Sequence, residues 1–422
     1  MNVSAHRAFS FLRTYGYERI SCSKEERTVA EALLNECTSL GVSAQLEEFT
    51  VPCGRVSHAL LRVTSPYVKE YEVTGYERAA STPEGGLDTE FLYVENADEV
   101  LLEQAKGKIV LVNGYLNRAT YEKLRKAEAA AILTFTGRTI DRESESDLNR
   151  CKLRETLTEP FGAIPVLNMR AASAAEIVRR GAKTAHIELT GECYDGTSQN
   201  VCATIPGTDK PSEVITLGGH YDSVYFSSGV HDNLSGSVIV LELLRYFAAH
   251  PPRRTLRFCW FGSEEQGLLG SKAYVKAHAD ELKACVAMLN FDVAAPTLGS
   301  NHLVTLATDD ALHYVAGILR EAGYGVRAKQ DTYSSDCIPF ADNGVPAINL
   351  ARFGANGADY MHNRHDSLKS GYLDEHALDI TLQQGFVLLE RLANAASFPI
   401  KREIAPEIRQ KVDEYLFKAK KE

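Results

Sequence analysis

Three apolar segments in the second half of the chain each lead directly into polar residues that can carry chemistry, and this feature most constrains the fold. The segments and the residues that follow them are 214–217 with His220, 255–261 with Glu264 and Glu265, and 286–291 with Asp292. From about residue 199 such segments alternate with helical ones, the pattern of a mostly parallel sheet covered by helices on both faces. Because ligands bind beyond the carboxyl ends of the strands in such sheets, we expect the functional site where these segments end.

The length of the chain, 422 residues, predicts two or three structural units. Residues 196–400 hold the three strand ends and are expected to form the main domain, to which residues 1–55 also belong. The sequence pattern changes over residues 56–195 and predicts a smaller, β-rich insertion there. The pattern of residues 401–422 predicts a C-terminal helix. The expected fold class is therefore α/β, with a mostly parallel mixed sheet between helices.

Composition and charge exclude several classes of protein. Hydrophobic residues make up 44% of the chain and charged residues 24%, which excludes a disordered or collagen-like chain. With 56 acidic against 46 basic residues the net charge is −10, so neither nucleic acid nor a membrane is expected as a partner. No apolar run is long enough to span a membrane, and charged residues interrupt the first 20 positions. We expect a cytoplasmic protein.

The nine cysteines are scattered and include no Cys-x-x-Cys pair. This spacing argues against a cysteine-ligated zinc site or a redox pair. It favours reduced thiols in a reducing compartment.

Two histidines and several carboxylates form the candidate site. They comprise the residues at the three strand ends, one aspartate in a glycine-bounded turn before an apolar helix, and one histidine far downstream: His220, Glu264, Glu265, Asp292, Asp232 and His362. Imidazole and carboxylate ligands suit zinc or a similar divalent ion, and the surplus of carboxylates indicates two metals that share a bridging one. Each residue alone has a simpler explanation; Asp232, for example, could be only a helix N-cap.

The local context of these residues resembles a known family. The matching motifs are Gly219-His220-Tyr-Asp222-Ser223, Asp232-Asn233, Ser263 to Ser271, Asn290-Phe-Asp292, Ser335-Asp336 with Pro339-Phe340, and His362 with Asp366. In order and context they are similar to the two-zinc peptidases that include aminopeptidase S, aminopeptidase Y, glutamate carboxypeptidase II and the transferrin receptor. The resemblance covers about 200 residues and implies the zinc exopeptidase, phosphorylase/hydrolase-like fold.

The resemblance also implies a role for each residue. It places His220 and Asp292 on one zinc, Glu265 and His362 on the other, and Asp232 between both. Glu264 would be the general base, since adjacent glutamates after a strand can point in different directions. Asp222, two residues beyond His220, would orient the imidazole, and Asp336 and Asp366 are candidates for similar work.

The insertion at 56–195 resembles the protease-associated domain of this family. The similar features are a strand at 107–112, a helix leading into Ala129-Ala-Ala-Ile132, and the Ile164-Pro165 step. We expect it to contribute no metal ligand and to shape the substrate cleft.

One departure from the family lies next to a metal ligand. The family commonly has a tyrosine directly before the second histidine, where it polarises the substrate carbonyl, whereas this chain has Met361 there and Tyr360 one residue earlier. A thioether cannot donate a hydrogen bond. We expect the local turn, which includes Gly357, to bring the hydroxyl of Tyr360 to the substrate oxygen.

The predicted function is a metallo-aminopeptidase that hydrolyses N-terminal residues from peptides with two zinc ions, or with other divalent metals. Three alternatives stay open: a single-zinc acyltransferase like glutaminyl cyclase, a carboxypeptidase of the same fold, and a non-catalytic protein of the receptor kind. The acyltransferase predicts one metal ion per chain. The receptor-like protein predicts that metal-ligand positions have been lost, whereas all five are present in this sequence. The sequence leaves side-chain preference and the native metal undetermined and is compatible with a homo-oligomer.

Overall fold

The computed structural model describes residues 2–114, 116–142 and 148–418, and the chain forms two compact units. Unit 1 consists of Met1–Val51 and Thr197–Glu422, and unit 2 of Pro52–Gly196. The sequence placed these boundaries after residues 55 and 195. The first boundary lies inside the long strand β1 (Ser43–Ser65), so no turn or break in the pattern marks it.

Unit 1 contains a mixed sheet whose central strands are parallel. In spatial order its strands are β13 (Arg327–Gln330), β12 (Gly299–Leu306), β14 (Ala347–Gly354), β11 (Cys285–Phe291), β9 (Lys210–His220), β10 (Arg254–Phe261) and the C-terminal part of β8 (Thr184–Ile205). The neighbours β14, β11, β9 and β10 pair in parallel, and β8 pairs antiparallel to β10. The predicted α/β class with a mostly parallel mixed sheet is confirmed.

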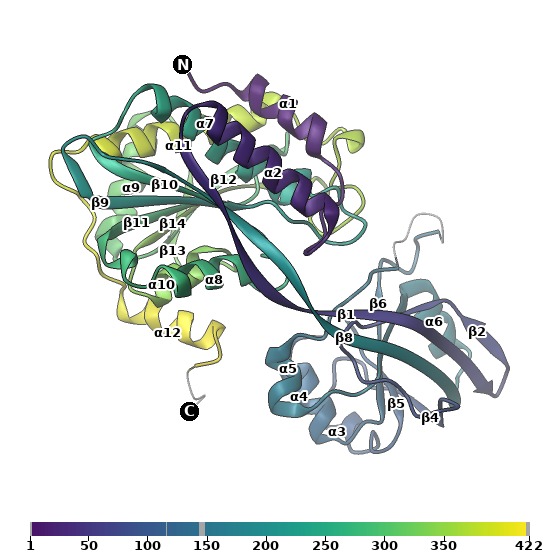
Figure 1. Ribbon diagram of the computed structural model, residues 1–422. Coiled ribbons are helices and arrows are strands. Elements are labelled where there is room, and N and C mark those ends of the chain that lie inside the picture. The colour runs from purple at the N-terminus through teal and green to yellow at the C-terminus, as the bar shows by residue number, and fades with distance from the viewer. Residues whose placement is uncertain (1, 115, 143–147, 419–422) are drawn as a thin grey trace. The chain divides into compact units, whose positions relative to one another are not determined.

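Helices cover both faces of this sheet (Figure 1). One hydrophobic cluster lies under α1 (Ala5–Tyr15), α2 (Lys24–Ser39), α7 (Ser235–Ala249), α9 (Asp309–Glu321) and α11 (Glu375–Asn394). A second cluster, on the other face, lies under α8 (Leu269–Ala277), α10 (Cys337–Asp342) and α12 (Pro406–Tyr415). The short helices η2 (Glu281–Ala284) and η3 (Leu368–Ser370) lie in connections. The candidate site residues predicted at the strand ends thus follow strands of a sheet that is buried on both faces.

Helix α7 fixes the turn that carries Asp232. The helix is buried along most of its length, and its residues Val238, Ile239 and Leu243 are fully buried. Burying each such side chain contributes roughly 1.5–3 kcal/mol. Because α7 begins two residues after Asn233, its packing against β9 and β11 holds the preceding turn against the ends of these strands.

Unit 2 has its own sheet and two small cores. Its elements are β2 (Lys69–Tyr71), β3 (Val73–Gly75), β4 (Leu87–Tyr93), α3 (Glu99–Leu102), β5 (Ile109–Leu111), α4 (Arg118–Lys126), β6 (Ala131–Thr136), α5 (Glu155–Phe161), β7 (Val166–Arg170) and α6 (Ala171–Arg179), with parts of β1 and β8. Strands β4, β5, β6 and β7 pair in parallel, and hydrophobic clusters lie on both sides of them. The strands expected at 107–112 and near 164 are β5 and β7.

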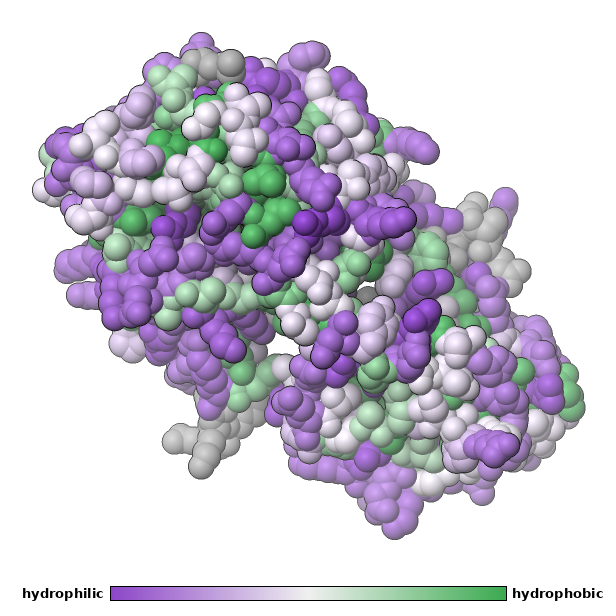
Figure 2. Space-filling model, viewed as in Figure 1, coloured by the Kyte–Doolittle hydropathy of each residue, from purple (hydrophilic) through white to green (hydrophobic). Residues whose placement is uncertain are grey.

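The surface visible in Figure 2 is largely hydrophilic, with hydrophobic residues in scattered patches. Within the described ranges, no helix is both long and apolar enough to cross a membrane. Helix α12 lies in the segment predicted as a C-terminal helix, of which residues 419–422 fall outside the described residues.

Candidate metal centre

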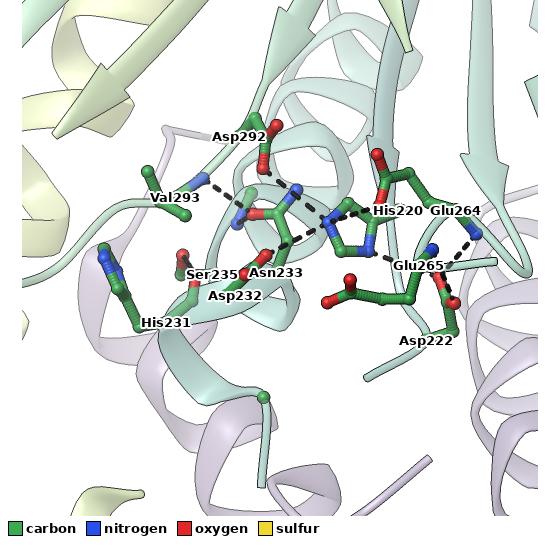
Figure 3. Close-up of polar contacts among 12 residues, drawn as sticks. His220, Asp222, His231, Asp232, Asn233, Ser235, Glu264, Glu265, Asp292 and Val293 are labelled. Carbon is green, nitrogen blue, oxygen red and sulfur yellow. Dashed lines mark hydrogen bonds and ion pairs between the residues drawn. The ribbon is translucent and has the colours of Figure 1, made fainter. Parts of the chain in front are cut away.

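The three strand ends meet at one edge of the sheet of unit 1. Strand β9 lies between β10 and β11 and is parallel to both, and His220 pairs in register with Phe261. Parallel strands in register present their carboxyl ends side by side. The sequence order therefore brings His220, the Glu264–Glu265 turn and Asp292 together, as Figure 3 shows.

Two sets of ligand atoms form around Asp232. His220 Nε2 lies 3.2 Å from one oxygen of Asp232 and 3.6 Å from Asp292. His362 Nε2 lies 3.1 Å from the other oxygen of Asp232 and 3.1 Å from Glu265. Asp232 is the member common to both sets.

The donor set fits zinc. Zinc binds imidazole nitrogen and carboxylate oxygen at about 2.0–2.2 Å, so two ligands of one tetrahedral ion lie roughly 3.3 Å apart. The separations of 3.1–3.6 Å within the two sets agree with this value. The residues present therefore suit two divalent ions that share the carboxylate of Asp232.

The charges of the centre also call for a cation. Burial raises the pKa of Glu264, Glu265 and Asp292, because each carboxylate loses hydration close to other negative groups. Burial opposes ionisation of Asp232 as well, but hydrogen bonds from His220 and His362 outweigh it and lower its pKa. A divalent ion in each set would compensate the remaining charge.

Asp222 lies behind His220 and is fully buried. Its Oδ1 lies 3.3 Å from His220 Nδ1 and accepts a hydrogen bond from the backbone N–H of Glu264 at 3.0 Å. Its Oδ2 accepts from the N–H of Glu265 at 3.1 Å. Asp222 thus ties the end of β9 to the turn after β10 and acts as a positioning residue for three members of the centre.

The turn that carries Asp232 is η1 (Val230–Leu234), and Asn233 secures it. Asn233 Nδ2 donates to the carbonyl of Phe291 at 2.8 Å. Its Oδ1 accepts from the N–H of Val293 at 3.0 Å, a bond drawn in Figure 3. These two hydrogen bonds fix the backbone on either side of Asp292. In the sequence, Asn233 stood out only as part of the Asp232-Asn233 family motif. That motif did not predict a role for its side-chain amide.

Asp366 supports the same turn from the downstream loop. Its carboxylate accepts from the N–H of His231 at 2.8 Å and from the N–H of Asp232 at 3.0 Å. The imidazole of His231 points away from His220, and its Nδ1 lies 2.6 Å from the carbonyl of Ala294. His231 is therefore a structural neighbour of the centre.

The loop after β14 brings His362 to the centre and holds Tyr360 nearby. The side chain of His362 is about half exposed, and its backbone φ is +55°. The hydroxyl of Tyr360 donates to the carbonyl of Gly357 at 3.0 Å, so in this conformation its proton is engaged within its own loop. The role of Tyr360 as oxyanion donor stays a prediction.

Two further groups near the centre come from the segment before α10. Asp336 is buried, and burial raises its pKa to about 7. Burial, with the charges of Asp292 and Asp232, raises the pKa of Tyr333 well above its usual value. The motif around Asp336 predicted a supporting role for this residue, whereas no motif pointed to Tyr333, because a tyrosine outside a motif is usually a core residue.

Comparison with known proteins agrees with this geometry. Residues 200–383, which carry the whole ligand set, match the model of peptidase family M28. This segment of the chain is therefore similar to peptidase family M28. The predicted resemblance to the zinc aminopeptidases is confirmed.

Similar proteins include some whose match extends over both units. Aminopeptidase YwaD of Bacillus subtilis is 28% identical over 345 residues, which are 79% of this chain and 71% of that protein. Leupeptin-inactivating enzyme 1 of Streptomyces exfoliatus is 36% identical over 190 residues, 43% of this chain and 41% of that enzyme. The solved zinc aminopeptidase BSAP from Bacillus subtilis superposes with a TM-score of 0.78 at 22% identity, covering 96% of this chain and 99% of that one. This similarity supports the same fold throughout.

Proposed function

We propose that this chain is a two-zinc aminopeptidase that removes N-terminal residues from peptides. The observation that carries the proposal is Asp232, whose two oxygens face two separate histidine and carboxylate sets at 3.1–3.2 Å. A bridging carboxylate of this kind has a clear use when two ions lie side by side. Bound zinc supplies Lewis acidity, which polarises a carbonyl and makes water a stronger acid at neutral pH.

Glu264 is the proposed general base. Its side chain is 11% exposed and its carboxylate lies 3.8 Å from His220 Nε2, whereas the adjacent Glu265 contacts His362. Its raised pKa favours a carboxylate that accepts a proton from water and later gives it to the leaving amine. The two N–H hydrogen bonds to Asp222 hold the backbone of both glutamates while their side chains diverge.

Similarity to known enzymes favours an aminopeptidase over a carboxypeptidase. The four carboxylates of the ligand and base set would be balanced by two divalent ions, so the charge of the loaded centre does not select a substrate terminus. The support is instead the similarity to aminopeptidase YwaD, which extends over 79% of this chain.

Neighbouring glutamates provide matched variants for the test. Glu264→Gln should keep two zinc ions per chain and lower kcat by roughly 10²–10⁴, the contribution of a general base. Glu265→Gln should instead reduce zinc content, because it removes a ligand. Zinc analysis and hydrolysis of an aminoacyl anilide would be measured for both; the reverse pattern would exchange the two roles.

The choice of substrate terminus has a separate test. An aminopeptidase should cleave an aminoacyl anilide and leave its N-acetylated form intact. Cleavage of the acetylated substrate, or of a free C-terminal residue, would contradict the proposal. Cyclisation of N-terminal glutamine with a single bound zinc would support the acyltransferase alternative instead.

We further propose that unit 2 is a protease-associated-like domain. The support is its parallel β5 and β6 with α4 between them, followed by β7. Two histidines of this unit, His58 and His186, both contact the carboxylate of Glu188. We therefore propose that neither of them is a zinc ligand.

We also propose a reducing compartment such as the cytoplasm. Cys202 and Cys259 lie directly opposite each other on antiparallel strands, are buried, and are not joined. Such a pair would be a candidate for oxidation in a secreted protein. Alkylation of the denatured, unreduced protein should modify both thiols, and a Cys202–Cys259 disulfide in protein isolated from its cell would contradict the proposal.

A further inference from the structure

Arg19 lies in the connection between α1 and α2 and is completely buried. Burying a guanidinium costs several kcal/mol unless its donors are satisfied. Its side chain donates to backbone carbonyls at Tyr221 (2.5 Å), Ser228 (2.7 Å), Gly229 (2.8 Å), Tyr17 (2.5 Å) and Tyr15 (3.4 Å). A planar group with five fixed donors can hold several carbonyls in one arrangement.

Three of these carbonyls belong to the loop between two metal ligands. Tyr221 directly follows His220, and Gly229 lies three residues before Asp232. One guanidinium therefore joins the start and the end of the loop that separates the two ligands. The same loop is also tied to the backbone of Arg19, because Ser223 Oγ accepts from its N–H at 2.8 Å and the Ser223 N–H donates to its carbonyl at 3.0 Å.

The loop packs so closely against Arg19 that there is no space for a side chain at Gly229. Gly229 has a φ of +55°, and a Cβ there would lie 2.8 Å from Arg19 Nη2 and 2.8 Å from the carbonyl oxygen of Asp232. The glycine allows both the left-handed backbone and the close contact. The loop is thus shaped around the guanidinium.

The same connection reaches the turn after β10. Ser21 Oγ lies 2.5 Å from Ser263 Oγ, and the buried carboxyl of Glu26 accepts from the N–H of Ser263 at 3.2 Å. Ser263 directly precedes Glu264. The connection between α1 and α2 therefore touches both loops that present residues of the centre, although it lies outside the segment that matches the family model.

We propose that Arg19 is a positioning residue of the metal centre, which sets the separation of His220 and Asp232 and thereby the affinity for the ion they share. The inference rests on the proposed zinc centre. A residue that only stabilises the fold would lower resistance to unfolding when changed and would leave zinc affinity untouched. Changes to groups that orient metal ligands typically weaken metal binding 10–100-fold.

Arg254 provides a matched control. It is also completely buried and donates to Glu213 and to the carbonyls of Leu392 and Ala395. It begins β10, however, and so lies at the opposite end of that strand from the centre. Arg254→Lys should cost stability for the same reason as Arg19→Lys.

The experiment compares the full chain with its Arg19→Lys and Arg254→Lys variants. Zinc affinity is measured by competition with a chelator, and thermal unfolding is measured without metal. We expect Arg19→Lys to weaken zinc binding 10–100-fold, because lysine keeps the charge and loses the fork, and Arg254→Lys to stay within twofold of the wild type. Wild-type affinity in Arg19→Lys, or an equal loss in Arg254→Lys, would overturn the proposal.

A second variant covers the case in which Arg19→Lys does not fold. Ser223→Ala removes one tie between Arg19 and the loop and leaves the guanidinium in place. It should weaken zinc binding at least threefold, and an unchanged affinity would overturn the proposal. The proposed function fails separately, if the wild type binds zinc and hydrolyses no peptide.

Discussion

Replacing Asp222 by Asn tests whether the carboxylate behind His220 organises the centre. Asp222 accepts two backbone N–H groups, at 3.0 and 3.1 Å, with its two oxygens. The asparagine has the same shape, but only one of its two terminal atoms accepts, so one N–H would face an NH₂ donor. A hydrogen bond to a charged group contributes about 1.5–3 kcal/mol, and the midpoint of unfolding should fall accordingly.

The same substitution should weaken the centre itself. The turn after β10 carries Glu264 and Glu265, and loss of one tie would let it move relative to His220. We expect zinc affinity and kcat each to fall 10–100-fold, the usual effect of disturbing a group that orients ligands. The only tryptophan, Trp260, is buried in β10 next to this turn, so its fluorescence follows the unfolding of unit 1.

Asp374→Asn is the control for this experiment. Asp374 also accepts a backbone N–H, from Ala377 at 2.8 Å, but at the start of α11, where asparagine caps equally well. It should leave zinc affinity and kcat unchanged. If Asp222→Asn also kept its zinc affinity within twofold and its unfolding midpoint, the positioning role of Asp222 would be refuted.

Three further substitutions probe separate parts of the molecule. Gly229→Ala should weaken zinc binding and lower stability, because a left-handed φ costs about 1–2 kcal/mol for alanine and the added Cβ meets the carbonyl of Asp232; wild-type affinity would contradict this. His186→Asn should leave zinc content unchanged. Contacts with Glu188 raise the pKa of His186, so its stabilisation is present below the unfolded pKa of about 6.5 and is lost as pH rises through the folded value. The stability gap between wild type and His186→Asn should therefore shrink from pH 6 to pH 9, and a widening gap would reverse the sign. Tyr360→Phe should lower kcat about 10²-fold or more with zinc retained, if its hydroxyl leaves Gly357 for the substrate oxygen, and a loss under about threefold would exclude it as oxyanion donor.

The sequence predicted the parts of the molecule that follow simple patterns. His220, Glu264, Glu265 and Asp292 could be placed together because each follows an apolar strand and parallel strands end at one edge. Asp232 lies in a turn rather than at a strand end; its place before an apolar helix made it a candidate, and the family resemblance supplied its role between both zinc ions.

The supporting groups could not be predicted in the same way. Arg19 lies in an unpatterned connection, and three of the five carbonyls to which its side chain donates lie more than 200 residues away along the chain. Glu26 looks like an ordinary charge in the first turn of α2, yet it is buried against Ser263. Such contacts depend on how α1 and α2 pack on the sheet, which a single sequence does not encode locally.

The first domain boundary shows the same limit. A change of composition near residue 56 suggested it, but β1 runs through the boundary as one strand from Ser43 to Ser65. The alternating pattern of a strand does not indicate which structural unit each end of β1 belongs to. Only the packing of the two cores places the division after Val51.

The central claim is that two ions share Asp232, and a zinc titration of the metal-free chain tests it most directly. Peptidase activity and bound zinc would be followed together as zinc is added in known equivalents. The account predicts that binding saturates at two zinc ions per chain and that full activity is reached only as the second ion binds. Full activity with a single tightly bound ion, and no second binding step, would contradict it.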